Sequence, residues 1–191
     1  MAKAKGASLI AVVKWLRHER TASQRLLPAH LQHYLDERVL VSSWYPEEDL
    51  LELIRALARI LPLGGGDVYE QIGRFGAREQ LAGLYRHLLE GGDELSLPRR
   101  GLVLWQTQHD SGRLSMAIEG PGAARLEIAD YALPSREMCG ILLGYTAEMF
   151  AMAELKEPSV RKQSCRLDGA GLCSWRCAWT PAQLSAPVSS R

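Results

Sequence analysis

The chain has 191 residues, 47% of them hydrophobic and 24% charged, which suits a single globular domain with a core of its own. Its 23 basic and 22 acidic residues nearly cancel, whereas nucleic-acid-binding proteins usually carry a strongly basic surface. No apolar run approaches the ~20 residues of a membrane span, and the N-terminal apolar stretch is too short for a signal peptide. We therefore expect a cytoplasmic protein with reduced thiols and with neither a nucleic-acid partner nor a membrane span.

The N-terminal half is predicted to be helical. Residues 8–19 and 29–38 favour two short helices, and residues 1–24 are expected to form an N-terminal extension. The clearest helix begins at Pro46, because proline suits the first turn and the three acidic residues that follow it suit the positive end of the helix dipole. Apolar residues then recur at helical spacing and predict one buried face: Leu50, Leu53, Ile54, Leu57 and Leu61.

Two more helices are expected before residue 112. Asp67 and Glu70 resemble a capping box, and the apolar pattern after them extends to Leu88, with Gly91-Gly92 as the stop. Glycines inside this helix, such as Gly73, lower its stability by about 1 kcal/mol each and are tolerable where another helix approaches closely. A shorter helix is predicted for residues 98–109.

The period of the pattern changes after residue 112. Alternation predicts a β-hairpin at 113–131 and a second one at 158–180, with a long helix at 135–154 between them. One face of this helix is small, with Cys139, Gly140 and Gly144. The prediction is an α+β fold, in which a helical N-terminal half precedes two β-hairpins that form a four-stranded antiparallel sheet. Residues 25–180 would be one domain and 181–191 a disordered tail.

Three cysteines form the most specific pattern in the chain. Cys139 lies in the long helix, and Cys165 and Cys173 flank the turn of the second hairpin with seven residues between them, which is not a zinc-finger spacing. Residues opposite each other on paired strands lie about 4.5–5.5 Å apart at Cα. Because the small face of the helix allows Cys139 to approach, we expect the three cysteines within a few ångströms of one another.

A helical cysteine followed by a hairpin with C-x7-C, Gly in its turn and an aromatic residue after the last Cys resembles the 4-vinyl reductase domain family of the haem-NO-binding-like superfamily. The family includes input domains of phenol- and xylene-responsive transcription activators. The resemblance implies a structural zinc ion held by Cys139, Cys165 and Cys173 and by a Glu three residues before the second cysteine. This chain has Lys162 there, whose ammonium cannot ligate zinc, so we expect a metal-free or weakly metallated site.

Other arrangements of these cysteines stay open on the sequence. They could pack as small buried hydrophobes, as free cysteines often do. Alternatively, Lys162 could point to solvent, with water or Cys177 as the fourth ligand. The resemblance covers roughly residues 25–180, and the helix start at Tyr45-Pro46 resembles short myxobacterial relatives.

Haem and enzyme chemistry are not expected. The nitric-oxide sensors of this broad fold need a proximal His and a Y-x-S-x-R motif, whereas Tyr131, Ser135 and Arg136 have these residue types at the wrong spacing. The histidines are interpreted as residues on helix surfaces: His18, His30, His33, His87 and His109. Residues 64–66 lack the Lys and Ser/Thr of a phosphate-binding loop, and no nucleophile elbow is present in the sequence.

The resemblance implies a ligand pocket where the 98–109 helix and the long helix cover the sheet. Its candidate residues are Trp105, His109, Tyr145, Met149, Phe150 and Trp175, although the same side chains could simply fill the core. The expected ligand is a small apolar or aromatic molecule. No cofactor is expected apart from zinc at the cysteines.

The leading functional prediction is a non-enzymatic small-molecule-binding or sensory and regulatory domain that signals to an unidentified effector protein. A homodimer through the N-terminal helices is expected, because three amphipathic helices cannot all bury their faces against one side of the sheet. A structural adaptor with a filled core, similar to vesicle-tethering subunits, and an auxiliary protein of tetrapyrrole metabolism are the alternatives. A cavity in the core would favour a sensor over an adaptor.

Overall fold

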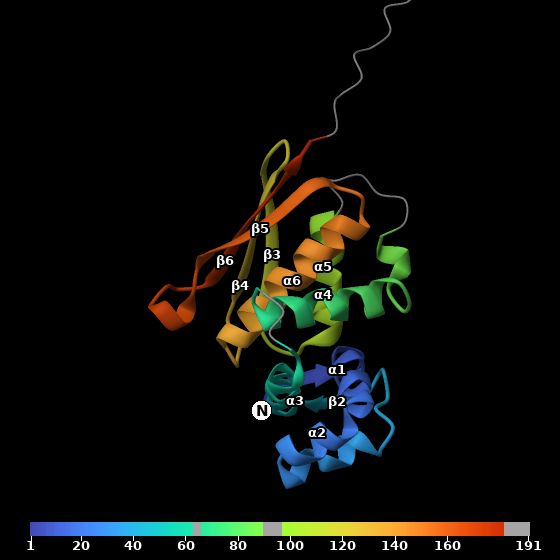
Figure 1. The fold of residues 1–191 in the computed structure, drawn as a ribbon. Helices are drawn as coiled ribbons and strands as arrows, with labels where there is room; N and C mark the ends of the chain where they lie inside the picture. The colour runs from blue at the N-terminus through green and yellow to red at the C-terminus, as the bar shows by residue number, and fades with distance from the viewer. Residues whose placement is uncertain (63–65, 90–96, 182–191) are drawn as a thin grey trace, which may run out of the picture.

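Helices dominate the N-terminal half of the fold, and a four-stranded antiparallel sheet dominates the C-terminal half, as predicted (Figure 1). The computed structural model describes residues 1–62, 66–89 and 97–181. The proposed tail after Pro181 and the glycine stops at 64–65 and 91–92 lie outside the described residues. Among the described segments, every helix is too short or too polar to span a lipid bilayer.

The N-terminal layer has a hydrophobic core of its own. It is built from β1 (Lys3–Lys5), α1 (Gly6–His18), α2 (Arg20–Leu26), the 3-10 helix η1 (Ala29–Leu35), β2 (Trp44–Pro46) and α3 (Glu47–Ile60). Leucines from three of these helices are fully buried together: Leu9, Leu16, Leu31, Leu53 and Leu57. Residues 1–24 supply β1, α1 and part of α2 to this layer, so its core includes the start of the chain.

The structure corrects two local predictions in this layer. The segment 29–38 forms a 3-10 helix that ends at Leu35, and α2 precedes it, where no helix was predicted. The antiparallel pair β1–β2, with Ala4 opposite Tyr45, was also not predicted, because three-residue strands are too short to display an alternating pattern.

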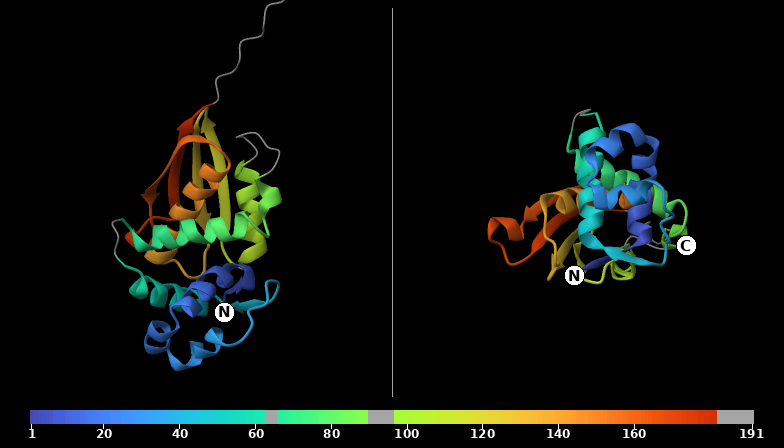
Figure 2. Two further views of the ribbon diagram at one scale, coloured as in Figure 1. Left: turned by 45° about the vertical axis from the view of Figure 1, so that its right-hand side comes forward. Right: turned by 90° about the horizontal axis from the view of Figure 1, so that it is seen from below.

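Helix α4 (Val68–Leu81) lies between the N-terminal layer and the sheet (Figure 2). The prediction that it continues to Leu88 is wrong: a turn follows Leu81, and only the short 3-10 helix η2 (Arg86–Leu88) comes after it. Leu84 continued the apolar pattern in the sequence, yet its side chain is 54% exposed. Without a packing partner for Leu84, and with Gly83 weakening the helix, the pattern alone does not sustain another turn.

Helix α4 crosses α6 (Arg136–Met152) with the two backbones in contact. A Cβ atom at Gly144 would lie 2.0 Å from the carbonyl oxygen of Glu70, and one at Gly73 would lie 2.2 Å from that of Ile141. At Gly140 a Cβ atom would lie 2.8 Å from the Cβ of Tyr69. The small face of the long helix therefore packs on α4, which requires glycine on both sides of the crossing.

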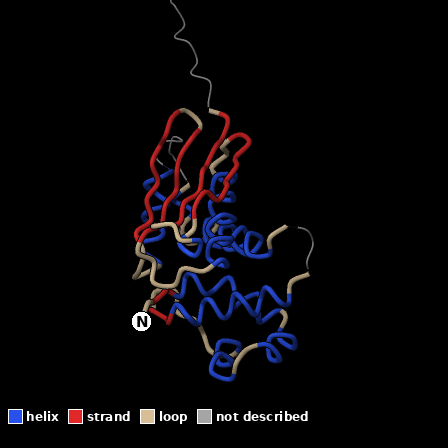
Figure 3. The backbone as a smooth tube through the Cα atoms, turned by 90° about the vertical axis from the view of Figure 1, so that its left-hand side faces the viewer, coloured by secondary structure: helices blue, strands red, loops and turns tan. Residues whose placement is uncertain are grey.

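The sheet has the order β3-β4-β6-β5, with β3 (Arg113–Gly120), β4 (Ala123–Ala129), β5 (Lys156–Ser164) and β6 (Cys173–Thr180), and with η3 (Arg166–Asp168) in the second hairpin. Its strands lie together at the end of the molecule away from α1–α3 (Figure 3). Along β6, alternate residues are buried in a second core with α5 (Leu97–Gln108) and α6: Cys173, Trp175, Cys177 and Trp179. The predicted face of this strand is confirmed.

Candidate functional site

A cavity of about 120 Å³ lies where the two cores meet. Its walls are mainly apolar and come from both halves of the fold, with Val12 and Ile54 on the N-terminal side and Leu126 and Met138 on the side of the sheet. Two glycines leave the space open. A Cβ atom at Gly76 would meet no heavy atom within 4 Å, and one at Gly101 would come no closer than 3.7 Å, to the Met149 methyl carbon.

A chain of polar side chains forms one wall of the cavity. Ser8 donates to Gln108 at 2.6 Å, and both Gln108 Nε2 and Tyr145 Oη donate to the Gln80 side-chain oxygen, at 3.1 and 3.0 Å. Gln80 Nε2 in turn donates to the carbonyl oxygen of Ala7 at 3.0 Å. Burial raises the pKa of Tyr145 well above its ordinary range, so its hydroxyl stays a donor. These residues come from α1, α4, α5 and α6, and the chain therefore links four helices.

Four of the six predicted pocket residues line this cavity: Trp105, His109, Tyr145 and Met149. Phe150 does not, because it packs edge-on against Trp179 with the ring centroids 5.6 Å apart. Trp175 lies fully buried on β6, beside the cysteines. Adjacent residues on a helix point about 100° apart, which is why Met149 faces the cavity and Phe150 the sheet.

The polar wall was missed by the sequence analysis. Gln80 and Gln108 are each one of several polar residues in an amphipathic helix, where a glutamine ordinarily belongs to the solvent side. Gln108 is only 6% exposed in the fold. The spacing of Gln80 within its helix gives no signal that it faces another polar residue rather than water.

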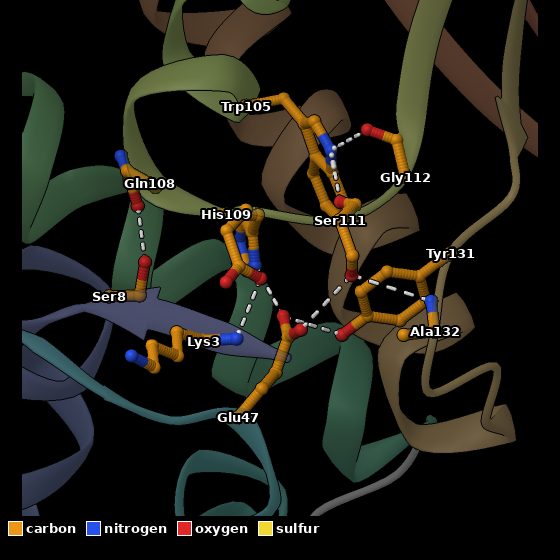
Figure 4. A network of polar contacts seen from close by, with 11 residues as sticks. Lys3, Ser8, Glu47, Trp105, Gln108, His109, Ser111, Gly112, Tyr131 and Ala132 are labelled. Carbon is orange, nitrogen blue, oxygen red and sulfur yellow. Dashed lines mark hydrogen bonds and ion pairs between the residues drawn. The ribbon is translucent and has the colours of Figure 1, made fainter. Parts of the chain in front are cut away.

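A buried carboxylate, that of Glu47, lies in a polar network with His109, which lines the cavity (Figure 4). Glu47 is 1% exposed, accepts a hydrogen bond from Tyr131 Oη at 2.8 Å, and lies 2.5 Å from His109 Nδ1 and 3.4 Å from Ser111 Oγ. Burial, followed by the charge of Glu47, raises the pKa of Tyr131 far above its usual range, so this hydroxyl also stays protonated. Trp105 stacks on the His109 ring with centroids 4.0 Å apart.

Glu47 begins α3, and its buried carboxylate joins α3 to the end of α5. The network also corrects one interpretation. His109, interpreted above as a residue on a helix surface, has a side chain only 9% exposed. His18 and His30 do lie on the surface, with side chains 82% and 62% exposed. The sequence carries no pattern that pairs Glu47 with His109, which is 62 residues away.

The three predicted cysteines meet where α6 packs on the second hairpin. The Sγ atoms of Cys139 and Cys165 are 4.0 Å apart, those of Cys139 and Cys173 are 3.9 Å apart, and those of Cys165 and Cys173 are 4.0 Å apart. The predicted convergence is confirmed. Cys177 is not part of this group, although it is fully buried on the same strand as Cys173.

Lys162 points into the cysteine group, and the alternative in which it points to solvent is wrong. Its Nζ lies 3.1 Å from Cys139 Sγ and 3.5 Å from the centroid of the Trp175 ring. The backbone N–H of Arg166 donates to Cys173 Sγ at 3.4 Å. The ammonium is thus held between a sulfur and an aromatic face, both of which attract a cation.

These contacts shift the pKa values of two of the thiols in opposite directions. Burial raises the pKa of Cys139 to about 12, in spite of the Lys162 ammonium. Burial also opposes ionisation of Cys173, but the Arg166 N–H and the Lys162 ammonium outweigh it and lower the pKa of Cys173. A single thiolate, stabilised by one cation, is therefore the charge state that suits the group.

The same geometry does not fit a zinc ion. A structural zinc takes four donors in a tetrahedron, and thiolates bind it after losing their protons. Cys139, Cys165 and Cys173 supply three donors, but the group on their open side is the cationic Lys162. Two like charges would then lie within a few ångströms of each other. We assign no zinc to this site.

The sequence matches no protein-family model and no curated protein, so membership of the 4-vinyl reductase family is not shown. The fold does match solved structures. An oxygen-binding H-NOX domain related to soluble guanylate cyclases aligns with a TM-score of 0.62 at 14% identity, covering 95% of this chain and 98% of that chain. An H-NOX protein from S. oneidensis in the Fe(II)NO state gives a TM-score of 0.63 at 14% identity, covering 92% and 99%.

The residues of this chain do not fit the haem that such a fold suggests. A cavity of about 120 Å³ is well below the ~300 Å³ at which pockets for drug-sized ligands begin, and a porphyrin is larger than most of those ligands. The residue types of the propionate motif are also engaged elsewhere. Tyr131 donates to Glu47, Ser135 caps α6 by accepting from the Met138 N–H, and Arg136 pairs with Asp168 at 2.7 Å. The chain therefore has the fold of the H-NOX domains, with a small apolar cavity at its centre.

Proposed function

We propose that this chain is a non-enzymatic sensory or regulatory domain that binds a small apolar or aromatic molecule in the central cavity and signals to a partner protein. The cavity of about 120 Å³ carries the proposal. An apolar cavity of ~150 Å³ binds benzene or xenon, so the volume here suits a ligand with a single ring. A structural adaptor with a filled core would have no use for this space.

The polar wall adds selectivity to the proposed site. Tyr145 and Gln108 both already donate hydrogen bonds to the Gln80 side-chain oxygen. A ligand hydroxyl therefore has to replace one of these hydrogen bonds to form its own. A phenol offers one donor and one acceptor on a single ring and matches this requirement. This series of hydrogen-bonded side chains continues to Ser8 of α1. Replacement of one hydrogen bond therefore alters a link between the N-terminal layer and α6. We propose this link as the route from ligand to partner.

Two further parts of the proposal rest on the resemblance to the 4-vinyl reductase family. They are a 4-vinyl-reductase-like unit at residues 25–180 and a homodimer through the N-terminal helices. A cytoplasmic location is a third part, which rests on the sequence pattern and not on the resemblance. The packing argument for the dimer no longer supports it, since these helices bury their apolar faces in a shared core within one chain. Light scattering at micromolar concentration decides between a dimer and a chain of 21.2 kDa.

Calorimetry and thermal unfolding with benzene, toluene and phenol test the ligand site, with biphenyl as an oversized control. A ligand at 100 times its Kd stabilises the fold by about 2.7 kcal/mol, which raises the Tm by roughly 5–10 °C in a chain of this size. We expect such a rise for at least one single-ring compound and none for biphenyl. The absence of binding by all three single-ring compounds at millimolar concentration would refute the proposal.

Two variants of α5 localise the ligand. Gly101→Leu places a side chain in the cavity and should abolish binding while the protein stays folded. Val103→Leu adds volume to the same helix at a position that is 48% exposed, and it should bind ligand as the wild type does. Gly76→Leu, which fills the cavity from α4, is the second test if Gly101→Leu does not fold.

A further inference from the structure

The cysteine group differs from an ordinary buried thiol in three respects. Three sulfurs lie within 4.0 Å of one another, about 2 Å more than the length of an S–S bond, which is about 2.05 Å. A cation lies 3.1 Å from one of the sulfurs. Cys139 is also partly exposed, whereas Cys165 and Cys173 are 7% and 4% exposed. Proximity, positive charge and access therefore coincide at Cys139.

A second, much smaller cavity adjoins the same sulfurs. It measures about 10 Å³ and is lined in part by Cys139, Cys173 and Trp175. This is roughly the space of one water molecule. The indole N–H of Trp175 is buried and has no hydrogen-bond partner among the described residues. The space beside the sulfurs thus admits only a very small molecule.

We propose that Cys139, Cys165, Cys173 and Lys162 form a metal-free thiol site that is oxidised by hydrogen peroxide to a disulfide between Cys139 and one of the two hairpin cysteines. Nothing in the ligand-sensing proposal requires this reaction, and the two sites have different reagents. A disulfide at Cys139 would join α6 covalently to the β5–β6 hairpin. Since α6 also supplies Tyr145 and Met149 to the central cavity, the bond would fix one wall of the ligand site.

The reaction has two steps, and its atoms balance. The Cys173 sulfur, as thiolate, attacks one peroxide oxygen, so that an S–O bond forms while the O–O bond breaks, and the departing hydroxide takes up a proton and leaves as water. The sulfur of Cys139 then attacks the sulfenic sulfur, so that an S–S bond forms while the S–O bond breaks, and the second hydroxide leaves as water with the proton of that thiol. Two thiols lose two electrons, and one peroxide becomes two waters.

Lys162 has two roles in this proposal. Its ammonium, together with the Arg166 N–H, favours the anionic form of Cys173, and a thiolate is the reactive form of cysteine. The same charge occupies the side of the group from which a fourth zinc ligand would come. Thiolates held by zinc would not be free to attack peroxide, so exclusion of metal and reactivity have the same cause.

Reaction of the reduced protein with hydrogen peroxide, followed by thiol alkylation and mass spectrometry, tests the chemistry. We expect the four free thiols to fall to two, the mass to fall by two hydrogen atoms, and the linked peptide to contain Cys139. Cys177→Ala is the matched control, because Cys177 is buried outside the group, and it should react as the wild type does. Cys173→Ser and Lys162→Met should each slow the reaction by at least ~10-fold.

Three results would overturn the proposal: a Cys173→Ser chain that is oxidised at the wild-type rate, oxidation that stops at sulfinic acid without a disulfide, or equal rates with cumene hydroperoxide, which is too large for the small cavity. Circular dichroism establishes that each variant is folded. Ligand binding by the central cavity is measured separately on the reduced protein, so failure of one proposal is distinguishable from failure of the other.

Native mass spectrometry with added zinc tests the exclusion of metal. The wild-type chain should retain no zinc after treatment with a chelator. Lys162→Glu replaces the cation by a carboxylate ligand and should bind one zinc per chain, whereas Lys156→Glu, an equal change of charge at an exposed position of the same strand, should bind none. Chelator-resistant zinc in the wild type, or a Lys162→Glu chain without zinc, would contradict the role given to Lys162.

Discussion

Gly144→Ala should destabilise the protein, although alanine is the better residue in a helix. The added Cβ would lie 2.0 Å from the carbonyl oxygen of Glu70 and 2.7 Å from its carbonyl carbon. Both are backbone atoms of α4, which cannot rotate away as a side chain can. The two helices must therefore separate by roughly 1.5 Å to reach a normal contact distance.

The magnitude follows from two opposing effects. Overpacking typically costs about 1–3 kcal/mol, and the backbone contact places Gly144→Ala at the upper end of that range. Replacing glycine inside a helix gains about 1 kcal/mol. The net loss should be about 2 kcal/mol, which lowers the Tm by roughly 4–8 °C in a chain of this length.

Urea unfolding followed by circular dichroism measures the effect, with Gly76→Ala as the control. Gly76 lies on α4, the partner helix of the crossing, but a Cβ atom there meets no heavy atom within 4 Å. This variant should keep the helix-propensity gain and be more stable than the wild type by up to ~1 kcal/mol. A Gly144→Ala chain as stable as the wild type would refute the backbone contact on which the reasoning depends.

Two further predictions concern buried or partly buried carboxylates. The hydrogen bond from Arg78, at 2.6 Å, lowers the pKa of Glu148, so its stabilising effect is complete above the ordinary glutamate pKa of about 4.3 and is lost as the pH falls below it. In urea titrations the wild type should therefore lose more stability than Glu148→Gln between about pH 5 and pH 3, and parallel curves would argue against this. Glu47→Leu removes the acceptor for Tyr131 and His109 and should lower the free energy of unfolding by at least ~2 kcal/mol. Glu52→Leu on the same helix is the control, and a loss below about 0.5 kcal/mol for both variants would contradict the prediction.

The sequence determined the order and type of most elements, because the spacing of apolar residues within a segment indicates a helix or a strand without reference to the rest of the chain. The alternation in 113–131 and 158–180 predicted the two hairpins, and β3, β4, β5 and β6 lie within or close to those limits. Hydrophobic spacing placed α3 and α6 to within about two residues. The cysteine spacing also predicted that the three sulfurs converge, since a helix and a hairpin turn with known geometry bring Cys139, Cys165 and Cys173 together.

The local sequence pattern did not predict the end of α4 or the β1–β2 pair, which depend on tertiary contacts. The prediction that α4 continues to Leu88 extrapolated an apolar spacing that has no partner in the fold. Strands β1 and β2 depend on pairing across some 40 residues and have no period of their own to detect. In both cases tertiary packing, rather than propensity, decides whether the element exists.

The chemistry of the sites was decided by the tertiary structure alone. Glu47 and His109, Gln80 and Tyr145, and Lys162 and Cys139 are pairs whose members lie 62, 65 and 23 residues apart. A polar side chain on a helix or strand has the same sequence signature whether it faces water or another polar group. Only the packing of α3, α4, α5 and α6 around one cavity, and of α6 on the second hairpin, determines which it faces, because burial and partner distance are properties of the assembled fold.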